Sequence, residues 1–129
     1  MIELHGWLTI WETHEDEDTY SPKELDSINQ KIRQIISEND CDITLQHRNG
    51  MTFLDTLFCA NHRTKEVEEI IQIYRSISEV ATGSYGVMYI HDDEDKQYYN
   101  QFQKYLFRKG SCIFSQDEDF SPCVPTIED

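Results

Sequence analysis

The alternation of apolar and polar residues predicts a strand at the beginning of the chain and two amphipathic helices behind it. Residues from Leu4 to about Thr13 alternate and are rich in β-branched and aromatic side chains, which favours a strand. Apolar residues at helical spacing indicate one helix from Pro22 to about Asn39 and another from about Lys65 to Ala81. The buried stripe of the second helix should consist of Val67, Ile70, Ile71, Tyr74, Ile77 and Ala81.

Both helices carry residues that are typical of helix ends. Ser21 can cap the first helix, Pro22 suits its first turn, and Glu24 completes a capping box. Gly83 follows the second helix and suits a left-handed C-terminal cap. The sequence therefore predicts where these helices begin and end as well as which face each one buries.

Short apolar runs in the middle of the chain predict further strands. Strands are expected at Cys41–His47, Met51–Phe58 and Gly86–His91. Asn49 and Gly50 separate the first two, and both residues tolerate the positive φ of a type I′ turn. The first two strands should therefore form a hairpin.

The last third of the chain is expected to be extended. Residues from about Tyr98 to Arg108 include glutamines that tolerate a helix, but their aromatic content favours a strand, which is the interpretation adopted. Lys109-Gly110 should turn the chain into a short strand at Cys112–Ser115. Residues 120–129 contain two prolines and should form extended coil.

These elements predict an α+β fold in a single domain over residues 1–129. The expected order is β-α-β-β-α-β-β-β, with few helices and strands that follow one another in hairpins. A mainly antiparallel sheet of about six strands, with both helices packed on one face, would bury both helical stripes.

Composition and charge exclude several classes of protein. The chain has 129 residues, of which 25 are acidic and 11 basic, and its net charge of −14 argues against nucleic-acid binding. Its 38% hydrophobic and 12% aromatic content suffices for a core, which argues against a disordered acidic chain. No apolar stretch approaches the roughly 18 residues that a membrane span needs, and the first residues lack the pattern of a secretory signal. A cytoplasmic protein that binds no membrane is expected.

The net charge is concentrated in four short segments that hold 14 carboxylates and no Lys or Arg, while the remainder is balanced at 11 acidic and 11 basic residues. These segments contain Glu12, Glu15, Asp16, Glu17 and Asp18; Asp92, Asp93, Glu94 and Asp95; Asp117, Glu118 and Asp119; and Glu128 and Asp129. One interpretation is solvated loops that keep the protein soluble. The other is a surface for a cationic partner, which converging segments would steer towards its site.

No catalytic motif is recognisable. The four cysteines lack zinc-finger spacing and are interpreted as small, buried, reduced residues. The acidic loop at Asp92–Asp95 lacks the Gly and terminal Glu of an EF-hand. His62 could act as an acid–base group, but a hydrogen-bonded residue at the start of a helix is the preferred interpretation. No cofactor and no metal is expected, although a metal-dependent hydrolase that uses carboxylates of the 12–18 and 92–95 loops stays an alternative.

A set of short motifs extends along nearly the whole chain. The motifs are His5-Gly6-Trp7, Asn49-Gly50, Asn61-His62, Gly83-Ser84-Tyr85-Gly86 with the following acidic loop, and the tail Ser121-Pro122-Cys123-Val124-Pro125 to Asp129. In this order and spacing they resemble the immunity protein 7 family of bacterial polymorphic toxin systems. The resemblance implies an α+β immunity protein that binds and neutralises the toxic C-terminal domain of a secreted effector in the cytoplasm. It implies no catalytic residues.

The charge pattern and the resemblance predict the same kind of partner, a cognate toxin domain with a basic active face such as that of a nuclease. Acidic side chains give steering, and aromatic residues should anchor the interface. The candidate anchors are Trp11, Tyr98 and Tyr99, with Tyr20 also possible; Trp7 is expected in the core. An acidic adaptor whose partner is not a toxin stays an alternative, and a monomer or weak homodimer is expected.

The tail motif has two interpretations. Residues 121–129 could strap the domain with Cys123 and Ile127 buried, which is preferred, or Glu128 and Asp129 could join the toxin-binding edge.

Overall fold

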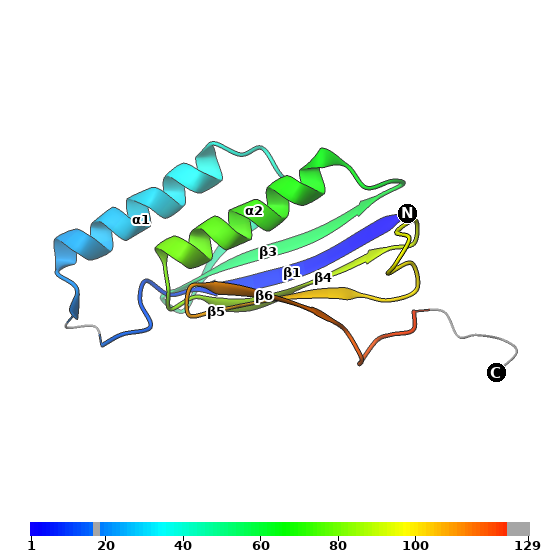
Figure 1. Cartoon of the computed structure of the whole chain (residues 1–129). Coiled ribbons are helices and arrows are strands. Elements are labelled where there is room, and N and C mark those ends of the chain that lie inside the picture. Colours follow the sequence, from blue (N-terminus) through cyan, green and yellow to red (C-terminus); the bar gives the residue numbers. More distant parts are fainter. Residues whose placement is uncertain (17–18, 124–129) are drawn as a thin grey trace, which may run out of the picture.

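Six strands and two helices, in the predicted order, make up the described part of the chain. A computed structural model describes residues 1–16 and 19–123, and Figure 1 shows the two helices lying above the sheet. The elements are β1 (Ile2–Ile10), α1 (Pro22–Ser37), β2 (Thr44–Arg48), β3 (Met51–Ala60), α2 (Lys65–Val80), β4 (Tyr85–Asp92), β5 (Gln103–Arg108) and β6 (Ser111–Gln116). The predicted α+β fold class is confirmed.

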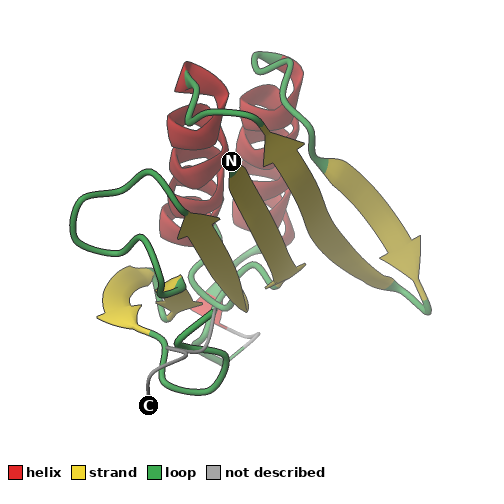
Figure 2. Cartoon of the chain, turned by 90° about the vertical axis from the view of Figure 1, so that its right-hand side faces the viewer, coloured by secondary structure: helices red, strands yellow, loops and turns green. Residues whose placement is uncertain are grey.

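The strands form one antiparallel sheet in the order β2-β3-β1-β4-β5-β6. Because β1 lies between β3 and β4, the connections through α1 and α2 each cross over one strand to reach a parallel one. The two crossovers run in opposite directions from strands of opposite direction. With the right-handed crossover that nearly all proteins use, both helices therefore reach the same face of the sheet (Figure 2).

Local sequence signals set several of the element ends. Ser21 Oγ accepts a hydrogen bond from the Glu24 backbone N–H at 3.2 Å, and the Glu24 carboxylate accepts one from the Ser21 N–H at 3.3 Å, which confirms the capping box. Asn49 and Gly50 have φ values of 51° and 77°, which confirms a hairpin turn with two positive φ angles. Lys109 and Gly110, between β5 and β6, also have positive φ values, of 49° and 76°, and form a second turn of this kind.

The core lies between the helices and the central strands. Every residue of the stripe predicted for α2 is buried. Gly6 lies below α2, and the absence of a side chain there leaves room for the ring of Tyr74. The Tyr74 hydroxyl, enclosed by the core, forms a hydrogen bond of 2.9 Å with Thr56 Oγ1, and burial raises the pKa of Tyr74 far above its ordinary value. Gly6 of the His-Gly-Trp motif thus has a packing role.

Replacing Tyr74 by phenylalanine should lower the free energy of unfolding by about 1–2 kcal/mol, because the buried Thr56 hydroxyl would lose its partner. Tyr85→Phe is the matched control, since the Tyr85 side chain is exposed. Urea unfolding followed by circular dichroism measures both variants. Equal stability of the two variants would contradict the role assigned to this hydrogen bond.

Some predicted strand limits were wrong. β1 begins two residues earlier than expected and ends at Ile10, and β2 begins only at Thr44. The largest error concerns the strand predicted from Tyr98, because β5 begins at Gln103. The Asp95 carboxylate accepts hydrogen bonds from the backbone N–H groups of Gln97 and Tyr98, and these bonds fold the aromatic segment into turns.

The predicted role of Gly83 as a left-handed cap was also wrong. Among the described glycines only Gly50 and Gly110 have positive φ, and Ala81, the C-cap residue that follows α2, has a φ of −111°. A Cβ atom on Gly83 would lie 2.4 Å from the Thr13 carbonyl oxygen and 2.7 Å from the Trp11 ring. Glycine is needed here because two segments meet closely.

Candidate functional site

The register of the sheet separates the acidic segments into two groups. Ile2 of β1 pairs with Asp92, whereas Glu12 follows Ile10 at the opposite end of that strand. Nine residues of strand span about 30 Å, so the 92–95 loop and the described part of the 12–18 loop lie far apart. Glu17 and Asp18 lie outside the described residues. This separation contradicts the hydrolase hypothesis, which needed the two loops to converge.

Two acidic segments do converge. Gln103 pairs with both Ile90 and Gln116, so Asp117 follows β6 at the same end of the sheet as Asp92. The Asp117 backbone N–H donates to the Phe102 carbonyl at 3.0 Å, which ties β6 to the loop after the 92–95 segment. We call residues Asp92–Asp95 and Asp117–Asp119 the acidic end. Glu128 and Asp129 lie outside the described residues.

Three aspartates of the acidic end are structural rather than available to a partner. Asp92 and Asp117 are buried, and Asp92 accepts a hydrogen bond from the Glu94 backbone N–H. Hydrogen bonds from the backbone of Tyr98 and Gln97 lower the pKa of Asp95. Burial alone would raise the pKa of Asp117, but the bonds from the Phe120 and Asp119 N–H groups and the Ser121 hydroxyl together lower it. Each of these carboxylates stabilises the turn that follows it.

Asp117→Ala should therefore lower the free energy of unfolding by about 1–3 kcal/mol at pH 7, because three hydrogen bonds lose their acceptor. The folded-state pKa is lowered, so this contribution is present above the ordinary aspartate pKa of about 3.9 and is lost as pH falls through the folded value. Urea unfolding should show that the free energy of unfolding of this variant is lower than that of wild type at pH 7, and that the difference between the two is smaller at pH 3. Asp119→Ala, which removes an exposed carboxylate from the same turn, should change little at either pH.

The carboxylates that remain for a partner are Asp93, Glu94, Glu118 and Asp119, all exposed. The Met1 ammonium lies 2.6 Å from Asp93 and lowers the pKa of that carboxylate. His62 Nδ1 lies 2.9 Å from Glu94 Oε1. His62 is therefore a hydrogen-bonded residue just before α2, as the preferred interpretation of the sequence predicted. For Glu118 and Asp119 the described contacts involve no cation.

Both helices lie on one face of the sheet and leave the other, which we call the open face, uncovered (Figure 2). The open face carries exposed apolar side chains. Trp7 is 44% exposed and packs edge-on against Tyr85, with the two ring centroids 6.3 Å apart. The expectation that Trp7 lies in the core was therefore wrong. Leu57 of β3 is 64% exposed on the same face. The register places Trp7, Phe53, Leu57, Tyr85, Val87, Tyr89, Leu106 and Ile113 on this face.

Two hollows mark the open face. One, of about 390 Å³, is lined by His5, Tyr89, Phe102 and Phe120, and we call it the aromatic groove. The other, of about 430 Å³, lies towards the far end of the sheet, where Trp7 and Tyr85 meet the basic side chains of Lys104 and Arg108. Tyr89 lines both hollows, so they adjoin on the open face, and the aromatic groove is the one that lies at the acidic end.

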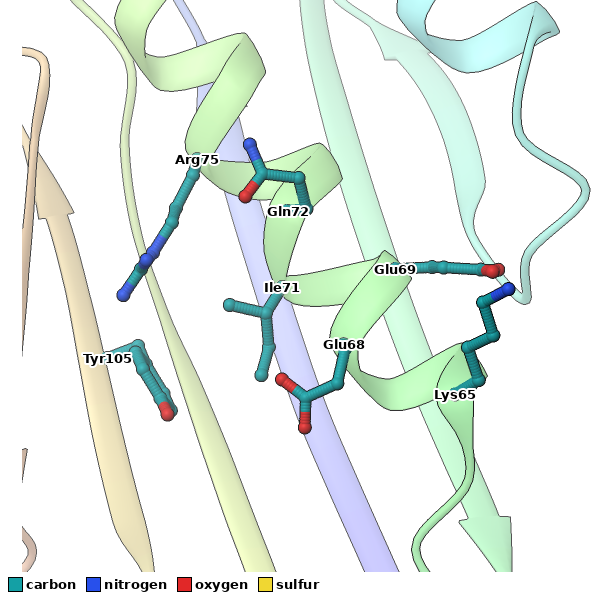
Figure 3. A pocket seen from close by; sticks show the side chains of 7 residues that line it. All are labelled: Lys65, Glu68, Glu69, Ile71, Gln72, Arg75 and Tyr105. Atoms are coloured by element: carbon teal, nitrogen blue, oxygen red, sulfur yellow. The ribbon is translucent and has the colours of Figure 1, made fainter.

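A third pocket, of about 380 Å³, lies between α2 and β5 on the opposite side of the sheet (Figure 3). Arg75 points towards Tyr105, with its guanidinium carbon 6.0 Å from the ring centroid, which is the geometry of a cation–π contact. Glu68, which also lines the pocket, already pairs with Arg63 through a hydrogen bond of 2.8 Å. The seven residues that line this pocket include no histidine, cysteine or serine.

The other candidate ligands and nucleophiles stay dispersed. Within residues 1–16 and 19–123, no three His, Cys, Asp or Glu side chains are grouped so that they could hold a metal ion. The four thiols are free; Cys59 is exposed and the other three half-buried, so the interpretation as buried residues was wrong. No helix in the described part of the chain is long and apolar enough to cross a bilayer.

The proposed anchors are distributed over both ends. Trp11 is exposed at the end opposite the acidic end, where its backbone N–H donates to Ser84 Oγ at 3.1 Å. Tyr20 is half-buried. At the acidic end Tyr99 is exposed, and Tyr98 packs on Phe114 at 5.8 Å. Trp11 therefore cannot act together with the tyrosines in one small interface.

The described part of the tail is tied to the acidic end. Ser121 Oγ accepts from the Phe102 N–H at 2.9 Å and donates to Asp117, and the Cys123 N–H donates to the Asn100 carbonyl at 3.0 Å. These contacts agree with a strap over this segment. Pro125, Ile127 and the last two acidic residues lie outside the described residues, so their part in it stays a prediction.

Sequence reasoning missed the open face and its groove. A signal was present, because Phe53, Leu54, Leu57 and Phe58 put apolar side chains on both faces of β3, whereas a sheet covered on one side is expected to alternate. Phe120 had no such signal, because its place depends on a turn formed far along the chain from Tyr89.

The comparisons with known proteins agree with the motif pattern. A family model described as Immunity protein 7 matches residues 1–129, the whole chain. No curated protein and no solved structure matches the chain in these comparisons.

Proposed function

Because the chain belongs to the immunity protein 7 family, we propose that it binds and neutralises the toxic C-terminal domain of a cognate bacterial effector. The single observation that carries this proposal is the match of the family model over residues 1–129. Neutralisation would occur in the cytoplasm of the producing cell, through binding and without catalysis by this chain.

The acidic end supports a more specific proposal about the toxin. Its exposed carboxylates come from two segments that the sheet register brings together, and Arg side chains form strong paired hydrogen bonds with such groups. A nuclease, or another enzyme with a basic active face, offers these side chains because it must bind phosphate or other anions. The acidic end would then occupy the surface that the anionic substrate needs.

Co-expression tests the function directly. The C-terminal domain of the effector encoded by the adjacent gene should arrest growth when expressed alone, and growth should recover when this chain is present. The two proteins should also co-purify. If the pair neither co-purifies nor restores growth, the proposal fails, and an acidic adaptor with another partner takes its place.

A further inference from the structure

The aromatic groove is the part of the open face that combines apolar walls with an acidic border. Its lining comes from two strands and two loops: His5 of β1, Tyr89 of β4, Phe102 just before β5 and Phe120 after β6. Phe120 remains 61% exposed although it is a large apolar side chain. Exposed apolar surface that is rimmed by polar residues is typical of a protein–protein interface.

The walls of the groove are held in place before any partner arrives. Tyr89 makes edge-on contacts with Phe102 and Phe120, with ring centroids 6.1 Å and 5.6 Å apart. The Phe120 backbone N–H donates to the Asp117 carboxylate at 2.8 Å, and the Phe102 N–H donates to Ser121 Oγ at 2.9 Å. A preorganised pocket binds more tightly because little side-chain freedom remains to be lost.

Acidic residues lie next to two of the residues that line the groove. Glu3 lies 2.7 Å from His5 Nε2, and Glu118 and Asp119 immediately precede Phe120. The second hollow of the open face carries Lys104 and Arg108. Lys104 pairs with Tyr89 and so lies beside the groove as well, and its charge helps to lower the pKa of Asp117. The border thus carries three carboxylates and one lysine, and charge complementarity points to a partner that presents an apolar side chain with Arg or Lys beside it.

We propose that the aromatic groove receives an aromatic or aliphatic anchor residue of the toxin domain, flanked on the toxin by basic side chains. This inference rests on the proposed function and assigns its central contact. A second copy of this chain is the less suitable occupant, because each copy has a net charge of −14 and would bring its own acidic segments to the border. Aromatic residues are enriched at the centre of protein–protein interfaces, and polar and charged residues surround them at the rim.

The test measures the Kd of the isolated toxin domain, taken from the effector encoded by the adjacent gene, by calorimetry. Phe120→Ala should weaken binding about 10- to 30-fold, as truncation at the centre of an interface does. Leu45→Ala is the matched control: Leu45 is 36% exposed, but it lies on β2, at the edge of the sheet opposite β6. The control should bind like wild type.

A second variant fills the groove instead of emptying it. His5→Trp should block the anchor and weaken binding by a similar factor, while circular dichroism shows an unchanged unfolding midpoint. This variant leaves Phe120 and its turn intact, so it separates a lost contact from a loosened segment. Weakened binding by both variants, with the control unaffected, supports the inference.

The contrary outcomes are distinct. If wild type binds the toxin domain and neither groove variant weakens binding, the inference is wrong and the proposed function stands. If wild type does not bind at all, the proposed function is wrong and the inference falls with it. If sedimentation shows a wild-type dimer that Phe120→Ala dissociates, the groove belongs to an interface between two copies, and the assignment to the toxin is wrong.

Discussion

Replacing Gly86 by alanine is expected to lower the free energy of unfolding by about 3 kcal/mol or more and to leave little folded protein if the domain is marginally stable. A Cβ atom at this position would lie 2.0 Å from the Trp7 carbonyl oxygen and 2.8 Å from Leu8 Cα. Both are backbone atoms of the central strand β1, which pairs with strands on both sides and cannot move without disturbing them. Urea unfolding followed by circular dichroism measures the loss.

Gly50→Ala is the control for this effect. Gly50 has a φ of 77°, and a Cβ atom there would have no heavy atom within 4 Å, so only backbone strain of about 1 kcal/mol is expected. A Gly86→Ala variant that is as stable as Gly50→Ala would contradict the close approach of β4 to β1. The Gly83-Ser84-Tyr85-Gly86 motif would then need a reason other than packing.

Reversing charge at the acidic end is expected to slow association with the toxin domain about tenfold at low ionic strength, because steering by complementary charge accelerates such encounters by roughly 10- to 1000-fold. The variant Glu118→Lys/Asp119→Lys changes two exposed side chains whose described contacts involve no cation. Its association rate should also depend less on salt than that of wild type. Stopped-flow mixing at several salt concentrations gives both quantities.

Glu15→Lys/Asp16→Lys is the matched control, since it changes the net charge by the same amount at the opposite end of β1. Steering by the acidic end predicts a much smaller effect for this control. Equal slowing by both pairs would show that only the total charge matters. No slowing by either pair would contradict an acidic interface, while the immunity function could still hold.

Local sequence signals were sufficient for much of the fold. The capping box at Ser21, the turn at Asn49-Gly50 and the apolar stripe of α2 depend on residues within a few positions of one another, and the structure confirms all three. The strand predicted from Tyr98 is absent because a turn competes with it: the Asp95 carboxylate accepts hydrogen bonds from the backbone N–H groups of Gln97 and Tyr98. Aromatic content alone does not distinguish a strand from a turn that packs on its neighbours.

The functional surface could be predicted only in part. The sequence shows clusters of acidic residues that contain no Lys or Arg, but whether these clusters meet depends on which strands pair. The pairing of Gln103 with Ile90 and Gln116 joins two clusters, and the length of β1 separates the third. The burial of Asp92 and Asp117 then removes two acids from the candidate surface, because they serve as hydrogen-bond acceptors within it.

The sequence by itself determined the order of the elements, the ends of α1, the hairpin turns and a net charge confined to short segments, because propensity, capping and periodicity act over a few residues. The tertiary structure alone decided that Trp7 lies on the face opposite the helices, and that Phe120 meets Tyr89 beside the acidic end. The physical reason is strand register: residues 31 positions apart become neighbours through hydrogen-bonded pairing and turn geometry, and no local pattern specifies that pairing.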